Sequence, residues 1–149
     1  MAVRFLKGNI FESQAQWLIN PVNCKGVMGA GLAKEFKKRF GVNYEAYFNY
    51  CKYGNLKPGE LYITHSDCGT TIVNFPTKDD WRDASKIEYI CDGLDALKFE
   101  LVTHGVRSVA IPALGCGLGN LDWRVVKHEI QMRLGDLPDG CVVLVYEPM

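Results

Sequence analysis

The chain has 149 residues, which fits one domain, because two domains of half that length would each bury too small a core. Hydrophobic residues make up 48% and charged residues 23%, a globular balance that excludes an intrinsically disordered chain. The 17 basic and 17 acidic residues cancel, so no overall positive field draws the chain onto long duplex nucleic acid or an acidic membrane.

Apolar segments of strand length alternate with helical patterns along the whole chain. Residues 71–75, 108–112 and 141–147 are nearly continuous in β-branched or apolar side chains, as expected for strands that are covered on both faces. The six predicted strands span residues 3–7, 16–20, 60–65, 71–75, 108–112 and 141–147.

The first two predicted helices lie between the second and third strands. Over residues 31–40, Phe36 and Phe40 fall on one face of the helix, and Gly41 is placed to end it. The second helix spans about residues 44–53 and is rich in tyrosine.

The last two helices have clear start signals. Ser85 and Glu88 have the spacing of a capping box, in which each side chain bonds a free backbone N–H of the first turn. Apolar residues then recur at steps of three or four up to Leu101. Asp122 is the predicted N-cap of the fourth helix, which ends at Gly135.

The order of these elements predicts the fold class. Strands that alternate with helices form a largely parallel sheet with helices on both faces. We therefore expect one α/β domain over residues 1–149, with three α/β/α layers around a mixed, mostly parallel central sheet. The zero net charge and the ordinary apolar fraction favour a monomer.

Cysteine spacing and the N-terminal sequence bear on metals and location. The six cysteines contain no CxxC pair and no zinc-ligand spacing. His128 and Glu129 begin a string like HExxH, but Met132 stands where the second histidine would be, so no metal site is predicted. The first residues lack the apolar core of a signal peptide, and no apolar run approaches the ~20 residues of a membrane span. We expect a soluble, cytoplasmic protein with reduced thiols and without metal, cofactor or membrane anchor.

A glycine-rich loop over residues 20–31 follows the second strand and leads into the first helix. Its glycines let the backbone turn sharply and approach a ligand, and the N-terminus of the next helix suits a phosphate. Asn23 is placed to bond a sugar hydroxyl. An ordinary turn between strand and helix has the same glycines, so this loop alone leaves both interpretations open.

A second loop, over residues 115–120, also lies between a strand and a helix. Its three glycines at alternate positions expose successive backbone N–H groups. Two such loops in one small domain are expected to hold a diphosphate from two sides. The usual dinucleotide fingerprint is absent, because neither loop opens a βαβ unit with an acidic ribose ligand.

Lys78 lies in a third loop, after the strand over residues 71–75. A lysine partly screened from water can act as a nucleophile or base toward the C1 carbon of a sugar. The alternative is that Lys78 pairs with Asp79 or Asp80 on a solvated loop. From the residues alone, that ordinary ion pair is favoured.

Cys24 and Cys116 lie in the two glycine loops, where a catalytic thiol is conceivable. The favoured interpretation is that each is a small apolar residue that fits its loop.

Four segments of the chain resemble the macrodomain family, in the family's order. They are KGNIFE (7–12), NPVNCKGVMGAGLAKEFKKRFG (20–41), NFPTKDDWR (74–82) and PALGCGLGNLDW (112–123). Within the family they are similar to the branch that contains the DarG antitoxin and the human terminal ADP-ribose glycohydrolase. The resemblance implies a three-layer α/β fold that binds ADP-ribose.

The resemblance also implies a role for particular residues. Asn9 and Ile10 are expected at the adenine, the first glycine loop at the distal ribose and diphosphate, and the second glycine loop at the other side of the diphosphate. Many macrodomains have Asp at the first of these positions, where Asn9 agrees with DarG-like sequences. Lys78 matches the catalytic lysine of this branch, which reverses the preference for an ordinary ion pair. The implied ADP-ribose contacts are Asn9, Ile10, Asn23, Val27, Met28, Gly29, Ala30, Gly31, Thr77, Pro112, Gly115, Cys116, Gly117, Leu118, Gly119 and Asn120.

One position separates the two parts of this branch. The human enzyme has an acidic residue directly after GCGL, whereas this chain has Gly119, as DarG-like sequences do. A lysine without that carboxylate favours a base-linked ADP-ribose over an ester on Glu or Asp. The sequence thus predicts a hydrolase that removes ADP-ribose from thymidine in single-stranded DNA.

Three alternatives stay open at this point. They are a reader module that binds ADP-ribose without turnover, a glycohydrolase acting on modified protein, and a phosphatase acting on ADP-ribose 1″-phosphate. A cognate DNA-modifying toxin is a further open partner. DarG carries a second region after its macrodomain, and because this chain ends at Met149 with its last strand, we expect a macrodomain alone.

Overall fold

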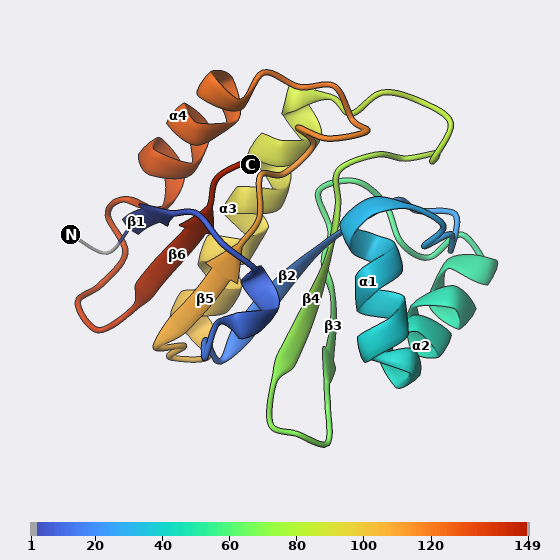
Figure 1. The fold of residues 1–149 in the computed structure, drawn as a ribbon, viewed down its shortest axis with the longest axis horizontal. Coiled ribbons are helices and arrows are strands. Elements are labelled where there is room, and N and C mark those ends of the chain that lie inside the picture. The colour runs from blue at the N-terminus through green and yellow to red at the C-terminus, as the bar shows by residue number, and fades with distance from the viewer. Residues whose placement is uncertain (1–2, 149) are drawn as a thin grey trace.

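Six strands form one sheet in the computed structural model, which describes residues 3–148 (Figure 1). The strand order is β1-β6-β5-β2-β4-β3, and every neighbouring pair is parallel except β3 and β4. The predicted mixed, mostly parallel sheet is therefore confirmed. The strands are β1 (Val3–Leu6), β2 (Trp17–Val22), β3 (Tyr62–His65), β4 (Thr71–Pro76), β5 (Ser108–Ile111) and β6 (Val142–Tyr146).

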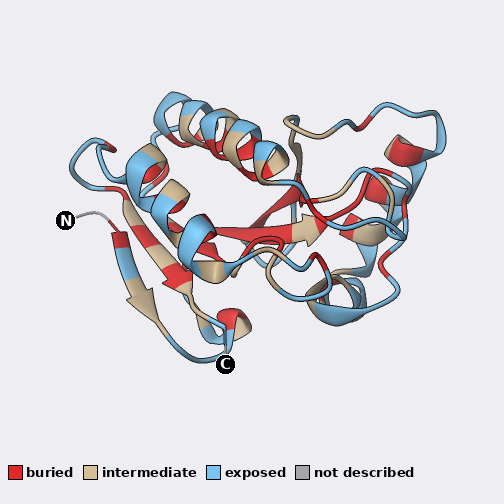
Figure 2. Cartoon of the chain, turned by 90° about the horizontal axis from the view of Figure 1, so that it is seen from above, coloured by how far each residue is buried: buried red, intermediate tan, exposed pale blue. Residues whose placement is uncertain are grey.

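Helices cover both faces of the sheet, which gives the three predicted layers (Figures 1 and 2). On β2, Ile19 packs in the cluster formed with the long helix α3 and with α4, whereas Leu18 packs in the cluster formed with α1. Successive side chains of a strand point to opposite faces, so Ile19 and Leu18 pack against helices on opposite faces of the sheet. The helices are α1 (Gly31–Arg39), α2 (Gly41–Lys52), α3 (Ile87–Thr103) and α4 (Trp123–Leu134), and a 3-10 turn spans Ile10–Glu12.

Strand β4, which lies between β2 and the edge strand β3, is buried along its whole length. Its Phe75 contacts α3 so closely that a Cβ added to Gly93 would lie 2.3 Å from the ring. A fully buried aromatic or aliphatic side chain stabilises the fold by roughly 1.5–3 kcal/mol. The sheet therefore gives the loops beyond its ends a rigid base.

Two predicted boundaries are wrong. The helix expected over residues 44–53 begins three residues earlier, at Gly41, and it follows α1 after the single residue Phe40 (φ −132°, ψ 67°). Gly41 thus starts a helix instead of ending one, and the chain turns at Phe40. β2 also runs on through Pro21, which is tolerated because β2 pairs with β5 only at its start.

The predicted capping box at the third helix is also wrong. Lys86 is the N-cap of α3, and no side chain caps that end of the helix. The backbone N–H of Ser85 donates instead to Gly119 O at 3.0 Å, in the second glycine loop. At α4 the prediction is confirmed, because Asp122 accepts a hydrogen bond from Arg124 N and Gly135 is the C-cap.

Between residues 3 and 148, no helix is long and apolar enough to cross a membrane.

Candidate functional site

Three loops meet at one edge of the sheet. They follow β2, β4 and β5, which are neighbours in the sheet and run parallel, so their carboxyl ends lie side by side. In Figure 1 the orange and yellow-green loops lie at the top and upper right of the molecule, and the light-blue loop lies below them, at the upper end of α1. Ligands of open α/β sheets bind at such an edge.

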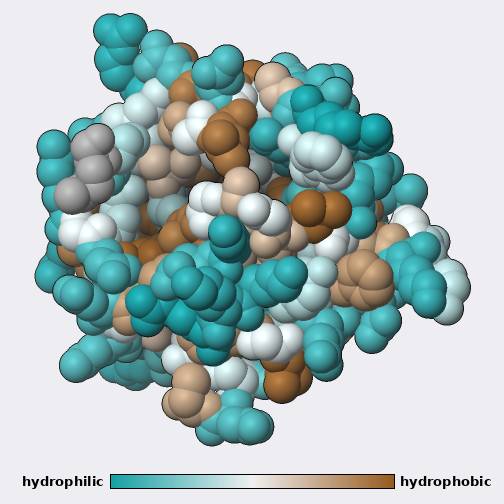
Figure 3. Space-filling model, turned by 45° about the vertical axis from the view of Figure 1, so that its right-hand side comes forward, coloured by the Kyte–Doolittle hydropathy of each residue, from teal (hydrophilic) through white to brown (hydrophobic). Residues whose placement is uncertain are grey.

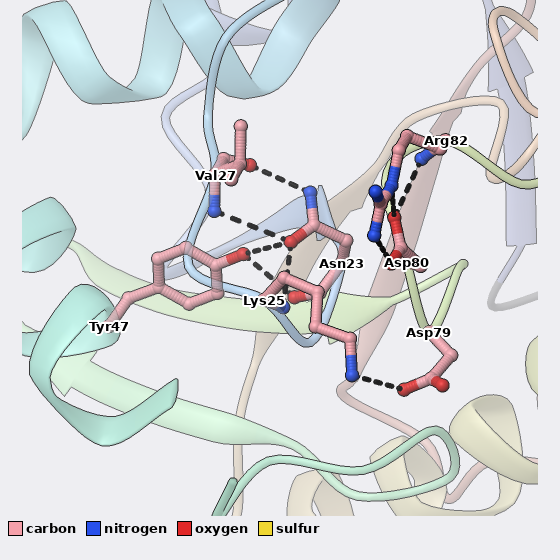
Figure 4. A network of polar contacts seen from close by, with 7 residues as sticks. All are labelled: Asn23, Lys25, Val27, Tyr47, Asp79, Asp80 and Arg82. Atoms are coloured by element: carbon pink, nitrogen blue, oxygen red, sulfur yellow. Dashed lines mark hydrogen bonds and ion pairs between the residues drawn. The ribbon is translucent and has the colours of Figure 1, made fainter. Parts of the chain in front are cut away.

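The first glycine loop is held in shape by Asn23 (Figure 4). The Asn23 amide donates to Val27 O at 2.8 Å, and its oxygen accepts from Lys25 N at 2.9 Å. The buried Tyr47 of α2 donates its hydroxyl to Asn23 O at 2.7 Å. Asn23 therefore organises the loop, and its predicted contact with a sugar hydroxyl stays a prediction.

The exposed part of this loop leads to the start of α1. Gly29, Ala30 and Gly31 are exposed, and Gly31 has a φ of 59°, which favours glycine. The N-cap residue Ala30 provides no side-chain bond to the first turn of α1. First-turn N–H groups without a side-chain cap can bind a phosphate oxygen.

The second glycine loop is a tight turn closed by its own backbone. Leu121 N donates to Gly115 O at 2.9 Å, and Asn120 N donates to Gly117 O at 3.1 Å. Asn120 has a φ of 70°, and it is the one residue other than glycine within 3–148 with a positive φ. The side chain of Leu118 lies 3.8 Å from the place where a Cβ on Gly31 would be. The two glycine loops therefore lie next to each other.

The loop after β4 ties the two glycine loops together. Its Asp79 O accepts from Cys24 N at 2.9 Å, on the first loop. On the second loop, Leu118 O accepts from Lys78 Nζ at 3.3 Å. All three loops are thus linked by hydrogen bonds, and Lys78 lies beside the second glycine loop.

Lys78 is bound by carbonyl oxygens. Its ammonium donates to Trp81 O at 3.4 Å and to Leu118 O at 3.3 Å. The ion pair with Asp79 or Asp80 is wrong, because Asp79 lies 3.9 Å from Lys25 and Asp80 binds Arg82 (Figure 4). Across residues 3–148, no carboxylate forms an ion pair with Lys78. Its positive charge is therefore available to a ligand.

The two loop cysteines do not behave as nucleophiles. Burial raises the pKa of Cys24 to about 12, with a smaller contribution from Asp79. Burial also raises the pKa of Cys116 to about 11, and Asp122 adds to this. Both thiols stay protonated at neutral pH, which agrees with their interpretation as small residues that fit their loops.

The other predicted contact residues differ in exposure. Asn9 follows β1 and is exposed, and its side-chain oxygen caps the 3-10 turn by accepting from Phe11 N at 2.9 Å. Several of the predicted contact residues are buried, so a ligand has limited access to them: Ile10, Met28, Thr77, Pro112, Gly115 and Gly119. Val27, Gly117, Leu118 and Asn120 are exposed, and Cys116 is half-buried. Their contacts with ADP-ribose stay predictions.

Ser85 is a site residue that the sequence did not indicate. Its buried hydroxyl has no hydrogen-bond partner, and it lies 2.1 Å from the place where a Cβ on Gly119 would be. Ser85 therefore fills the space that a side chain at position 119 would need. The sequence did not indicate this packing against Gly119, because Ser85 also fits the S-x-x-E pattern of a helix cap.

A separate hollow of about 400 Å³ lies at the opposite ends of the strands. Trp17, Thr71 and His104 contribute to its walls. Trp17 and Thr71 begin β2 and β4, so this hollow is the length of the sheet away from the glycine loops. Across residues 3–148, no group of three His, Cys, Asp or Glu side chains could hold a metal ion.

These features define a class: a three-layer α/β module with two adjacent glycine loops at the carboxyl ends of parallel strands and one lysine beside them. The chain belongs to the macro domain family, whose model matches residues 19–130.

Comparison with known proteins agrees with this assignment. The chain is 42% identical over 152 residues to a protein of Thermus aquaticus called DNA ADP-ribosyl glycohydrolase, a match that covers 99% of this chain and 41% of that relative. The solved macrodomain of Mycobacterium tuberculosis DarG has a TM-score of 0.95 and 35% identity, with 99% of this chain and 98% of that chain covered. Thermosipho africanus DarTG in complex with ADP-ribose has a TM-score of 0.91 and 34% identity, with 99% of this chain and 42% of that chain covered. The chain thus spans about two fifths of the length of the Thermus relative.

Proposed function

We propose that this chain binds ADP-ribose and hydrolyses its bond to thymidine in single-stranded DNA. The name of the Thermus relative and the ADP-ribose complex of the Thermosipho protein support this proposal. The fold supports it further, since the two glycine loops lie next to each other at the carboxyl ends of neighbouring strands.

Backbone groups provide most of the binding in this proposal. The first turn of α1, at Gly31, offers N–H groups and a positive helix end to one phosphate. The second glycine loop, around Gly117, faces it from the other side. The distal ribose then lies toward Lys78, and the adenine toward Asn9, at the carboxyl end of β1.

The observation that carries the catalytic part is the environment of Lys78. Its Nζ lies between two exposed loops, bound to two carbonyl oxygens and to no carboxylate in the part of the chain that the structure describes. A lysine in this position can act on the C1″ carbon of the distal ribose in two ways: by attack as an amine, or by charge stabilisation of the departing base. In the net reaction the bond from C1″ to the base breaks, water supplies a hydroxyl to C1″, and the base takes the proton.

Removal of the Lys78 side chain tests this proposal. We expect Lys78→Ala to lower the turnover of an oligonucleotide carrying ADP-ribosylated thymidine by at least about 100-fold, the size typical of a lost catalytic group. The dissociation constant for free ADP-ribose should change little, because backbone groups supply that binding. Gel separation of modified and unmodified oligonucleotide measures the first quantity, and calorimetry the second.

A surface lysine of α3 provides the matched control. Lys98→Ala removes the same side chain from a site where it pairs with Asp136 at 2.7 Å, away from the three loops. This control should keep full activity. Full activity in Lys78→Ala would contradict a catalytic role of that residue. Binding of ADP-ribose without turnover of any modified oligonucleotide by the wild type would instead support a reader module.

Chemical trapping separates the two possible roles of Lys78. Attack by the amine on C1″ gives an imine when the sugar ring opens, and a hydride reagent reduces that imine to a stable adduct on Lys78. Mass spectrometry of tryptic peptides detects the adduct. Turnover in the presence of the reagent without any adduct would favour stabilisation of the leaving base by charge.

A further inference from the structure

Trp81 differs from the other two tryptophans of the chain. Trp17 is buried in the main hydrophobic cluster, and Trp123 packs against that cluster while its indole N–H donates to Glu147 at 3.1 Å. Trp81 belongs to no cluster, and 52% of it is exposed. The fold therefore gives no packing reason for an aromatic side chain here.

The position of Trp81 is next to the catalytic lysine. Its carbonyl oxygen accepts from Lys78 Nζ at 3.4 Å, and the same Nζ also binds the carbonyl of Leu118, whose side chain is 72% exposed. Both residues lie on loops at the carboxyl edge of the sheet, and the Trp81 loop projects to the upper right in Figure 1. The exposed Trp81 thus belongs to the same loop as Lys78, and its backbone binds the lysine directly.

Arg82 holds a positive charge against this indole. Its guanidinium carbon lies 5.5 Å from the centre of the Trp81 ring. Asp80 fixes that arginine, because its carboxylate accepts from Arg82 Nε at 3.0 Å, from the second guanidinium nitrogen at 2.7 Å and from Arg82 N at 3.0 Å (Figure 4). The arginine side chain nevertheless remains 68% exposed. Asp80 therefore holds the cation beside the ring.

We propose that Trp81 and Arg82 form a stacking platform for a nucleobase next to the modified nucleotide in single-stranded DNA. This inference rests on the proposed function and identifies how the DNA strand is recognised. An aromatic face with an adjacent cation is the chemistry that binds unpaired bases, and each stacked base contributes about 1–3 kcal/mol.

Few other groups near the site can supply this affinity. The chain has no net charge, and Asp79 and Asp80 offset Lys25 and Arg82. On the face drawn in Figure 3, apolar side chains form small, separate patches within a hydrophilic surface. Stacking on one ring should therefore dominate, and the gain from DNA should depend only weakly on salt.

Binding measurements on an inactive protein test the platform. In the Lys78→Ala background, we expect an oligonucleotide with one ADP-ribosylated thymidine to bind about 5- to 150-fold more tightly than ADP-ribosylated thymidine nucleoside, the factor that corresponds to one stacked base. Trp81→Ala should remove this difference and leave nucleoside binding unchanged. Trp81→Phe should retain part of it. Tyr53→Ala, which removes an aromatic side chain that is 76% exposed after α2, is the matched control.

Several outcomes would overturn this inference. One is equal affinity for oligonucleotide and nucleoside while Trp81 is present, and another is an undiminished difference in Trp81→Ala. A gain of the same size with an ADP-ribosylated peptide would show that the surface recognises protein instead. A gain that depends on Trp81 in a protein whose wild type cleaves no oligonucleotide would keep the platform and reject the proposed reaction.

Discussion

At the scale of single residues, Gly119 has neighbours that leave no room for a side chain. An added Cβ would lie 2.1 Å from the hydroxyl of Ser85 and 2.6 Å from Gly115 O. We expect Gly119→Ala to destabilise the protein by about 2–3 kcal/mol, as overpacking does, and to weaken ADP-ribose binding because the second loop must shift. Thermal unfolding and calorimetry check the two effects.

The neighbouring Gly117 is the control for this prediction. Nothing lies within 4 Å of a Cβ added there, and its φ is not in the left-handed range. Gly117→Ala should leave the stability unchanged within about 0.5 kcal/mol. If both variants behave alike, the packing of Ser85 against Gly119 does not constrain the loop.

Lys78 and Ser85 show how much the sequence alone reveals about single residues. Lys78 is predicted to be catalytic through the resemblance of its motif. Of the two carbonyl groups that bind it, that of Trp81 is local, but that of Leu118 comes from a loop 40 residues away. Ser85 has a local pattern that fits a helix cap, yet its backbone bonds to Gly119 because of tertiary structure. Local spacing cannot report such contacts.

At the scale of elements, Asn74 of β4 connects four parts of the fold. Its oxygen accepts from the amides of Asn20 on β2 and Asn43 on α2, both at 3.1 Å. Its own amide donates to Asn43 and to Tyr62 O on β3, both at 2.9 Å. This buried network holds α2, and with it Tyr47 and the first glycine loop, against the sheet.

We expect Asn74→Ala to lower the free energy of unfolding by about 3 kcal/mol. The substitution removes the only oxygen within residues 3–148 that accepts from the buried amide nitrogens of Asn20 and Asn43, and Asn20 keeps only its weak contact with Met28 Sδ at 3.8 Å. Each buried group that loses its partner costs about 1–3 kcal/mol. Urea denaturation measures the change. The exposed Asn49 of α2 offers a control, since Asn49→Ala should cause no loss. A loss below about 1 kcal/mol in Asn74→Ala would mean that water replaces the amide.

The elements also show where sequence patterns succeed and fail. The apolar runs of β4 and β5 identified strands that are buried on both faces, whereas β6 alternates between buried and half-buried residues although its run is also apolar. The boundary between α1 and α2 was misplaced, because glycine fits both the end and the start of a helix. The order of the strands in the sheet depends on packing between distant segments, which periodicity does not encode.

At the scale of the whole molecule, the two ends of the sheet carry different loops. The carboxyl end holds the three loops of the candidate site, and the hairpin between β3 and β4 lies at the other end (Figure 1). Cysteines lie at both ends of the sheet. Cys24 and Cys116 lie in the glycine loops with raised pKa values, whereas Cys68 is exposed on the hairpin. A hydrogen bond from Ser66, with help from Thr70, lowers the pKa of Cys68.

These differences make thiol labelling a test of where the ligand acts. A lowered pKa increases the thiolate fraction at a given pH, so Cys68 should react first with iodoacetamide at pH 7–8, while the protonated Cys24 and Cys116 react only when their loops open. ADP-ribose at 100 times its dissociation constant should slow the labelling of Cys24 and Cys116 by up to about 100-fold, because it binds only the closed loops. Labelling of Cys68 should not change. Mass spectrometry of each cysteine peptide with time measures all three rates. Equal protection at both ends would mean that the ligand stabilises the fold as a whole, and protection of Cys68 alone would place the site at the hairpin end of the sheet.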